Sequence, residues 1–518
     1  TAASVEMTPE EAAAIRARAD RRLAALGDIF PPGAWEREDP IVLESRQMRL
    51  LFKEYQSLPD GRVNLVPCTL VVLPDRARTP EGQAGRTIVM RAPTGAVLEF
   101  DEPLDLRQGR LARLVGGSLR GQVTIRGTPS APGAEDDVEI VTRDVELDEL
   151  EIHTGEAVQF RYGRSHGSGR GLLARLTPRA TPQGPDALGQ GPNIGGVDSI
   201  RLDRDVRIRL EGMNGGFLPG TPAKNAAESS DVPPPPVLVS CRGSLTLNVP
   251  ANVITLADHV DVVRPTPDGG SDQITCDLLA ILMAHEGEQK EGEKPKGPLK
   301  PTEIQAKGAP VVVRSTGAEL EARATRLGYE VATRRILLDG TEPVSLVAKG
   351  SEMEARKIDY TPGPPGDPGS LMAVGPGWLR VVSPGQPPSH ARWQQWLRMR
   401  PDGEGHVVSI SGDADVVVET RGRLSAGEMH LWLDVVRPPA GAPRRDPAAG
   451  PDLSGVKPSR MLARGMVEVG ADQVLARTDR LELWFRELPP PPAVPAGPRP
   501  AQVAATPTAP PPTVAPVQ

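Results

Sequence analysis

From about residue 38 onward, apolar and polar residues alternate along the chain in short runs separated by turn signals such as PDG at 59–61. Examples of these runs are VNLVPCTLVVL (63–73), RTIVMRA (86–92), GQVTIRG (121–127), AVQFRYG (157–163) and VRIRLEG (206–212). Alternation with a period of two is typical of strands whose two faces meet different surroundings. Many short strands without intervening helical periods predict an all-β sandwich, barrel or solenoid.

In three segments the alternation changes phase in the middle. The shared frame is an apolar residue, one gap, Ala, four gaps, Leu, one gap, and then Leu or Tyr. Its twelve positions are Leu320, Ala322, Leu327, Tyr329, Leu424, Ala426, Leu431, Leu433, Val474, Ala476, Leu481 and Leu483. The odd step from Ala to Leu sends the second half of a strand to the opposite face, unless the chain bends or contains a bulge there.

We interpret the phase change as a repeated device. The runs VVV at 311–313 and 416–418, and MVEV at 466–469, precede the frame, with a glycine in the turn between. Each unit is therefore predicted to be a strand, a tight turn and a returning strand that bends at a fixed place, so that both halves face one curved interior. Such units stack edge to edge and share one continuous core. Chance matches among ordinary alternating strands are the alternative.

The chain is predicted to comprise five regions. Residues 1–37 hold a short helix over 8–27, with Thr8 as its N-cap, and a linker. The others are an N-terminal β domain (38–218), middle β repeats (237–360), C-terminal β repeats (376–487) and a disordered Pro/Ala-rich tail (488–518). Pro-rich stretches between these regions have the composition of disordered insertions.

Composition narrows the function classes. The chain has 518 residues, with 57 Pro, 54 Gly, a formal net charge of -7 and 3% aromatic residues. The charge gives no basic footprint for nucleic acid, and no apolar run approaches the roughly 20 residues that span a bilayer. Cys68, Cys241 and Cys276 are too few for a zinc ribbon or a disulfide framework. They are interpreted as buried apolar side chains, with a Cys241–Cys276 disulfide as the alternative.

Two segments resemble a known family. SRMLARGMVEVGADQVLARTDRLELWF (459–485) resembles the repeat of OstA/LptA-type lipopolysaccharide-transport proteins, in which an A-x-G-x-V strand is followed by A-x-x-L-x-Y. TRDVELDELEIHTGEAVQFRYGRSHGSGRGLLARL (142–176) is similar to the membrane-anchored LptC-type member. The resemblance covers scattered pieces of the chain and implies a folded-over antiparallel sheet, a β-taco or β-jellyroll. Length, Pro-rich insertions and tail depart from the family, so a divergent large member and a descendant with another cargo both stay open.

The resemblance also implies a function. It predicts a non-enzymatic carrier or bridge in the periplasm or cell envelope that contributes to outer-membrane lipopolysaccharide transport and assembly, without a cofactor or metal. Its partners would be lipopolysaccharide or a similar amphipathic lipid, and other envelope transport proteins docked by strand addition at exposed edges. A membrane tether would lie upstream of residue 1. The twelve frame positions are the predicted lining of a groove for acyl chains, and an ordinary filled core is the alternative for each.

Two other functions stay open. A structural scaffold or adhesin-like β protein would have a dry, filled core and no ligand. A carbohydrate-active β-solenoid enzyme would need clustered acidic residues with exposed aromatic residues on one sheet face, and the sequence supplies few of them.

Several motifs that could carry chemistry are interpreted as structural. GRSHG (163–167) matches Gly-x-Ser-x-Gly, but the residues after Ser165 are not helical, so a hairpin turn is predicted. The seven histidines lack metal-ligand spacing, and DVELDELE (144–151) is interpreted as a solvated sheet face. Trp393 and Trp396 are predicted to lie on a short helix that plugs one end of a repeat, with an exposed patch as the alternative.

Overall fold

The computed structural model describes a chain that is almost entirely β-structure. It covers residues 27, 29–45, 48–73, 87–103, 112–129, 136–178, 194–211, 235–266, 269–285, 299–364, 367–382, 387–435, 456–471 and 474–485. These residues form a 26-stranded sheet and one short 3-10 helix, η1 (Trp35–Arg37). The predicted all-β fold of stacked antiparallel strands is confirmed. The helix predicted over 8–27, apart from Gly27, and the tail predicted over 488–518 lie outside the described residues.

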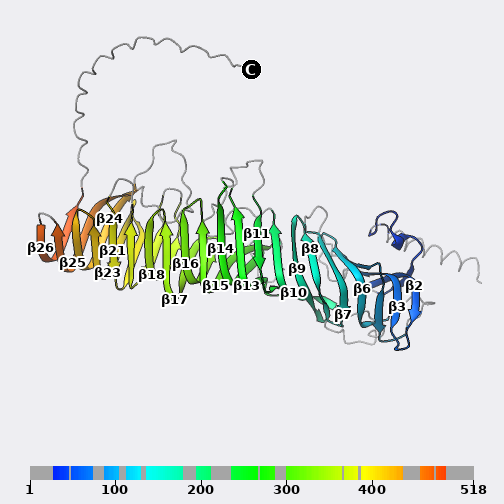
Figure 1. Cartoon of the computed structure of the whole chain (residues 1–518). Helices are drawn as coiled ribbons and strands as arrows, with labels where there is room; N and C mark the ends of the chain where they lie inside the picture. Colours follow the sequence, from blue (N-terminus) through cyan, green and yellow to red (C-terminus); the bar gives the residue numbers. More distant parts are fainter. Residues whose placement is uncertain are drawn as a thin grey trace, which may run out of the picture.

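The strands follow one another in chain order along the length of the molecule (Figure 1). The N-terminal strands are β1 (Ile41–Glu44), β2 (Met48–Ser57), β3 (Val63–Val72), β4 (Ile88–Ala92), β5 (Ala96–Phe100), β6 (Leu114–Gly127), β7 (Val138–Leu147), β8 (Glu151–Tyr162) and β9 (Ser165–Pro178). The middle strands are β10 (Ile194–Leu210), β11 (Val237–Cys241), β12 (Leu245–Asn248), β13 (Val253–Pro265), β14 (Ser271–His285), β15 (Leu299–Ser315), β16 (Leu320–Glu330), β17 (Arg335–Ala348) and β18 (Ser351–Thr361). The C-terminal strands are β19 (Ser370–Val374), β20 (Gly377–Val381), β21 (Ser389–Trp393), β22 (Trp396–Asp402), β23 (Gly405–Val418), β24 (Gly422–Val435), β25 (Val456–Ala471) and β26 (Val474–Trp484).

Nearly every long strand pairs antiparallel with the strands that precede and follow it in the sequence. This holds, for example, from β13 through β18 and from β23 through β26. At four positions one long strand is replaced by two short consecutive ones: β4 with β5, β11 with β12, β19 with β20, and β21 with β22. A neighbouring long strand pairs with both pieces, as β3 and β6 do with β4 and β5. The pairs β19 with β20 and β21 with β22 lie next to each other, between the long strands β18 and β23.

A fold line crosses the middle of the sheet and divides it into two walls. The strand pairing is interrupted there by register shifts, such as those between Leu119 and Gln122 in β6 and between Ala257 and Val260 in β13. The breaks between the short strands fall on the same line, because β11 pairs with one half of β10 and β12 with the other half. A row of aligned bulges bends a sheet sharply. The molecule is therefore a long, folded-over sheet.

Residues at the fold line adopt left-handed backbone conformations. Asp144, Asp205, Asp258 and Asp413 have φ values of 45°, 56°, 67° and 49°. Aspartate enters this region more readily than other residues that carry a side chain. At Asp144 the carboxylate also accepts a hydrogen bond from the backbone N–H of Gly121 on the neighbouring strand, at 2.8 Å. The bend is thus encoded by short polar residues and glycines.

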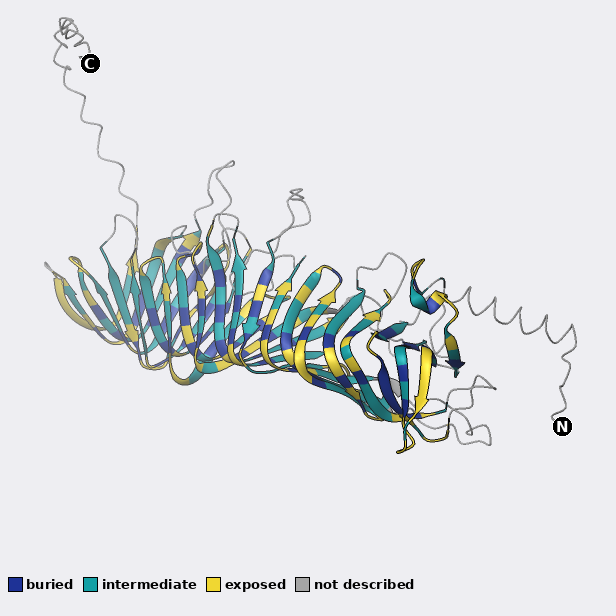
Figure 2. Ribbon diagram, turned by 45° about the vertical axis from the view of Figure 1, so that its right-hand side comes forward, coloured by how far each residue is buried: buried dark blue, intermediate teal, exposed yellow. Residues whose placement is uncertain are grey.

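The hydrophobic core fills the space between the two walls. Figure 2 shows buried segments recurring in successive strands along the length of the sheet. One cluster of buried residues extends from Val158 in β8 to Val467 in β25, and a second, from Leu43 to Leu147, occupies the N-terminal end. Leu202 and Val237, which lie on either side of the domain boundary predicted at residues 219–236, belong to the same cluster. The boundary between the two clusters of buried residues therefore lies between β7 and β8.

The predicted phase change is present in the strands. In β16 the buried residues are Ala322 and Ala324 before the fold line and Leu327 and Tyr329 after it. The register shift lies between Arg323 and Arg326, so the odd step from 324 to 327 keeps both halves of the strand turned toward the same interior.

The position of the bend within the frame is not the same in all three copies. The break in pairing follows Ala324 in β16 and Thr478 in β26, two residues beyond the frame alanine, but in β24 it directly follows Ala426. Gly427 occupies the bend of β24, and Met429 is the first buried residue after it. The prediction that every copy bends at the same position of the frame is therefore wrong by two residues for β24.

The N-terminal end is covered by η1 and carries a buried ion pair. The Glu36 side chain is 0% exposed, and its Oε1 accepts hydrogen bonds from Thr69 Oγ1 at 2.9 Å and from Arg91 Nε at 2.6 Å. Arg91 Nη2 donates to the other carboxylate oxygen at 2.7 Å. Because a buried charge must be paired and hydrogen-bonded, this contact holds η1 against β3 and β4.

Candidate functional site

The twelve positions predicted to line a groove differ in exposure. Ala322, Leu327, Tyr329, Leu424, Ala426 and Leu433 are buried, Leu320, Leu431 and Leu481 are half-buried, and Val474, Ala476 and Leu483 are exposed. Five of them, Ala322, Leu327, Tyr329, Leu424 and Ala426, belong to the continuous core, and Leu320 and Leu481 pack against it. Their role as a lipid lining stays a prediction.

In the middle of the sheet the interior is filled by side chains from adjacent strands. Leu327 is 2% exposed and Tyr329 is 1% exposed. Leu327 lies opposite Ala306 of β15 and Leu338 of β17, which are also buried. Burial raises the pKa of the Tyr329 hydroxyl to about 12, because the charged phenolate would lose its hydration.

Two adjoining cavities lie on the sheet between β7 and β13, with volumes of about 590 Å³ and about 810 Å³. Gln159, Ser168, Arg207 and Ser240 line both of them. These four residues are paired neighbours across β8, β9, β10 and β11. They point away from the core, since the residues beside them in sequence, such as Val158 and Val239, are buried in it.

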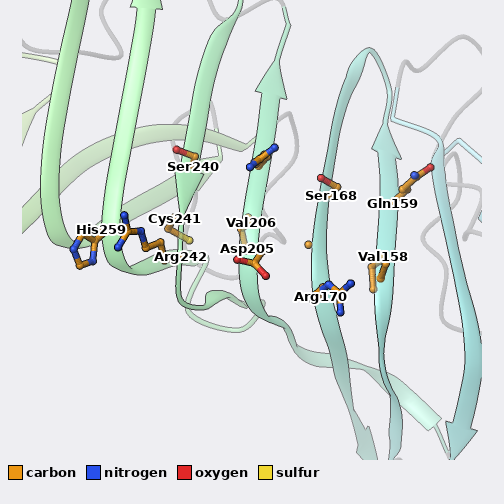
Figure 3. A pocket seen from close by; sticks show the side chains of 13 residues that line it. Val158, Gln159, Ser168, Arg170, Asp205, Val206, Ser240, Cys241, Arg242 and His259 are labelled. Atoms are coloured by element: carbon orange, nitrogen blue, oxygen red, sulfur yellow. The ribbon is translucent and has the colours of Figure 1, made fainter.

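The lining of the smaller cavity includes three arginines, of which Figure 3 labels Arg170 and Arg242. Arg170, Arg207 and Arg242 come from β9, β10 and the turn after β11. Within the part of the chain that the structure describes, none of the three guanidinium groups has an ion pair. Asp205 is the one carboxylate among the lining residues. The lining therefore carries an excess of positive charge.

Neutral hydrogen-bonding groups accompany the arginines. The hydroxyls of Ser168 and Ser240 and the amide of Gln159 lie on the same row of the sheet. His259 is at the far side, where its Nδ1 lies 2.6 Å from the Asp258 carboxylate. Guanidinium and hydroxyl donors are the groups that bind oxyanions such as phosphate, sulfate and carboxylate. The arrangement can bind an anion but includes no activated nucleophile.

The arginine cavity was not among the predicted sites. The sequence does contain a signal, because RLDRDVRIRL (201–210) holds four arginines, and Arg207 and Arg209 alternate with the core-facing Val206 and Ile208. Alternating arginines are common on solvated sheet faces, so the pattern alone does not distinguish a site from a surface. The missing information was which of these arginines have acidic neighbours, and that depends on strand register.

The serine motif occupies a hairpin turn, as predicted. Ser165 starts β9 and lies opposite Tyr162 of β8, and its Oγ accepts a hydrogen bond from the backbone N–H of Glu211 at 3.2 Å. Among the described residues, no group of His, Cys, Asp and Glu side chains could hold a metal ion. The described residues also include no helix whose length and apolar character would let it cross a membrane.

All three cysteines are buried as free thiols. Burial raises the pKa of Cys68 and of Cys276 to about 12, and it is also the main cause of a raised pKa at Cys241. Desolvation disfavours the thiolate. The thiols therefore act as small apolar side chains of the core.

The predicted tryptophan helix is wrong. Trp393 ends β21 and Trp396 begins β22, with a break at the fold line between them. The break resets the alternation, and this produces a spacing of three that mimics a helical turn. The Trp393 ring is 1% exposed and lies against the backbone of Gly375 and Gly377.

Comparisons with known proteins returned no relatives. No family model matches the sequence, and neither a curated protein nor a solved structure matches it. The likeness to lipopolysaccharide-transport proteins therefore rests on the sequence patterns alone.

Proposed function

We propose that the chain is a non-enzymatic carrier or bridge for an amphipathic lipid of lipopolysaccharide type in the cell envelope, with acyl chains held between the two walls of the folded sheet. The observation that supports this proposal is the single apolar interior that extends from β8 to β25. A lipid tail gains about 0.8 kcal/mol for each CH₂ group buried in such surroundings. Affinity would therefore need no catalytic residue and no cofactor.

The filled interior is compatible with this proposal because of how the walls are joined. Hydrogen bonds run between neighbouring strands within each wall, and the backbone connects the two walls only along the fold line. Elsewhere the walls contact each other through side chains alone. Separating the walls at their outer rims would expose apolar side chains but would break no hydrogen bond between strands. Lipid tails would replace the lost contacts, as they do in other apolar sites.

A lipid-retention experiment tests the proposal. The full chain would be incubated with lipid A and, separately, with a neutral phospholipid, then repurified and extracted for mass spectrometry. We expect lipid A to be retained and Leu481→Asp to reduce the amount, since Leu481 is half-buried at the accessible end of the interior. Val347→Asp is the matched control, because Val347 lies on the outer face of β17, away from both ends of the sheet, and is 39% exposed.

The rival function is a structural scaffold with a dry core. It is favoured by the close packing of the interior, where Leu327 lies opposite the buried Ala306 and Leu338. If the wild-type chain retains neither lipid, the carrier proposal fails and the scaffold takes its place.

A second candidate function is oxyanion binding at the arginine cavity, supported by the three guanidinium groups without ion pairs. Isothermal titration with inorganic phosphate should detect binding to the wild type, and Arg207→Gln should abolish most of it. Arg201→Gln is the control, because Arg201 lies on the same strand but is paired with Asp203 at 3.1 Å. Binding to vesicles that contain phosphatidylglycerol, without binding to free phosphate, would assign the site to a lipid headgroup. No binding in either arm would exclude this function.

A further inference from the structure

Within the part of the chain that the structure describes, the folded sheet ends at β26, and no strand pairs with its outer edge. Within the described residues β26 pairs only with β25. Large apolar side chains are exposed around this edge, namely Met466, Val474, Leu475, Leu483, Trp484 and Phe485. Leu475 is 93% exposed and Trp484 is 66% exposed. A long, apolar, unprotected strand edge is a template for pairing with another chain.

The backbone groups that are free at this edge belong to the outward-facing residues. The N–H of Phe485 donates to the carbonyl of Ser459 at 3.0 Å, on the β25 side. In a strand the direction of the side chain and the direction of the N–H group alternate together. Residues on the same face as Phe485, including Leu481, therefore direct their polar groups to β25. Leu475, Arg477, Glu482 and Trp484 direct theirs to the free edge.

We propose that two copies of this chain join tail to tail by antiparallel pairing of β26 with β26 about a twofold axis, which makes one continuous folded sheet. In this register the outward pairs are Leu475 with Trp484, Arg477 with Glu482, and Asp479 with Arg480. The inward pairs are Ala476 with Leu483 and Thr478 with Leu481. Each pair occurs twice, as a twofold interface requires, and each joins apolar to apolar, acid to base, or a threonine methyl to leucine.

The phase change makes this pairing possible. A twofold axis normal to the sheet keeps the interior of one copy continuous with the interior of the other, so directly opposed residues must point to the same face. Leu475 and Trp484 are an odd number of positions apart, and they share the outer face only because the alternation switches at the bend after Thr478. The bends of the two copies coincide in this register.

Charge selects this register over its neighbours. Sliding one strand by two residues places Arg477 opposite Arg480 in one direction and Asp479 opposite Glu482 in the other. Like charges directly opposed across strands are destabilising. Within one chain Arg477 pairs with Glu468 at 3.0 Å, and Glu482 pairs with Arg460 and Arg480. The intermolecular pairs would extend this row of alternating charge.

A head-to-tail arrangement offers a poorer partner. The strand at the other end of the sheet, β1, is 4 residues long and pairs only with β2 among the described residues. β26 has 11 residues. Pairing with β1 would leave most of the free edge and either Leu475 or Trp484 uncovered, whereas a second β26 covers the whole edge.

Charge reversal tests the proposal on the full chain, without any lipid. We expect the wild type to sediment with twice the 55.1 kDa mass of the chain, and Arg477→Glu and Glu482→Arg each to be monomeric. In a mixture of the two variants, the new Glu at 477 would face the new Arg at 482, and the unchanged Glu482 would face the unchanged Arg477. The mixture should therefore regain the dimer.

The controls separate this register from other forms of association. Arg423→Glu on β24 also reverses an exposed arginine, one paired with Asp415 at 2.6 Å, and should leave the dimer intact. The double variant Ala476→Cys with Leu483→Cys should form disulfides between copies under mild oxidation. A monomeric wild type at every accessible concentration would overturn the proposal. So would a mixture of the two charge variants that stays monomeric while each variant keeps the wild-type circular dichroism spectrum.

Discussion

The returning strands β16 and β26 carry the same frame of apolar positions but have different surroundings. β16 lies between β15 and β17, and its residues Ala322 and Leu327 are buried. Among the described strands β26 has only β25 beside it, so the equivalent Ala476 is exposed and Leu481 is half-buried. The frame thus encodes the shape of a bent strand. The number of neighbouring strands determines how much of the surface of its side chains is buried.

The largest expected difference between these strands is in stability. Leu327→Ala should lower the free energy of unfolding by about 2–5 kcal/mol, because it removes a buried side chain and leaves a cavity. Leu481→Ala should cost about 1 kcal/mol, since less of its surface leaves water on folding. Urea denaturation followed by circular dichroism measures both. Equal losses at the two sites would contradict the comparison.

Thiol reactivity sharpens the same contrast between interior and edge. Cys276 lies in the core with its pKa raised by burial to about 12 from the ordinary 9.0, so its thiolate fraction at neutral pH falls by about a thousandfold. In the monomeric Arg477→Glu variant, a cysteine introduced by Leu475→Cys at the free edge should react with a thiol reagent at the rate of a model peptide, because Leu475 is 93% exposed in a single chain. Mass spectrometry after short labelling would show one modified site. Equally fast labelling of Cys276 would contradict its burial.

Glycines at the fold line extend the comparison to the backbone. A Cβ at Gly377 would lie 2.5 Å from the Trp393 ring and 2.7 Å from the carbonyl oxygen of Glu354. We therefore expect Gly377→Ala to lower the free energy of unfolding by about 1–3 kcal/mol through overpacking. At Gly470, in β25 next to the free edge, a Cβ would meet nothing within 4 Å. Gly470→Ala should be neutral, as measured for both variants by urea denaturation, and a loss there as large as that at Gly377 would refute this assignment.

The smallest expected effect concerns a surface ion pair between inner strands. Arg335 donates to Asp359 at 2.5 Å and 2.9 Å, and this hydrogen bonding lowers the pKa of Asp359. A lowered folded-state pKa contributes stability above the unfolded value of about 3.9 that is lost as the pH falls through the folded pKa. Arg335→Met should therefore cost about 0.5 kcal/mol at neutral pH, as for other solvated pairs, and nothing in strong acid. A loss that persists in acid would point to packing of the arginine stem.

Much of the architecture was predictable from local sequence. Period-two alternation identifies the strands, and the odd step in segments such as 320–329 indicates a bend, because both signals lie within one strand. The wrong prediction of a helix at Trp393 and Trp396 also came from reading a local pattern. A break at the fold line produces helical spacing within a short window, and only the pairing of β21 and β22 with β23 resolves it.

The candidate sites were less predictable because they depend on relations between strands. The arginine cavity requires that Arg170, Arg207 and Arg242 lie near one another and that none of them forms an ion pair among the described residues, and register determines both conditions. The exposure of Leu475 and Trp484 depends on β26 being the last strand of the sheet. The alternation of apolar and polar residues within one strand indicates neither the register between strands nor the position of a strand in the sheet.

The pairing of each strand with its neighbours in sequence also affects how the chain is made. Most β sandwiches must join segments far apart in the chain, which slows their folding because long loops have to close first. Here β13 through β18 pair in succession, so each newly synthesised strand can add to the one that has just left the ribosome. A sheet of this length could therefore grow during translation, with its exposed edge always on the most recent strand.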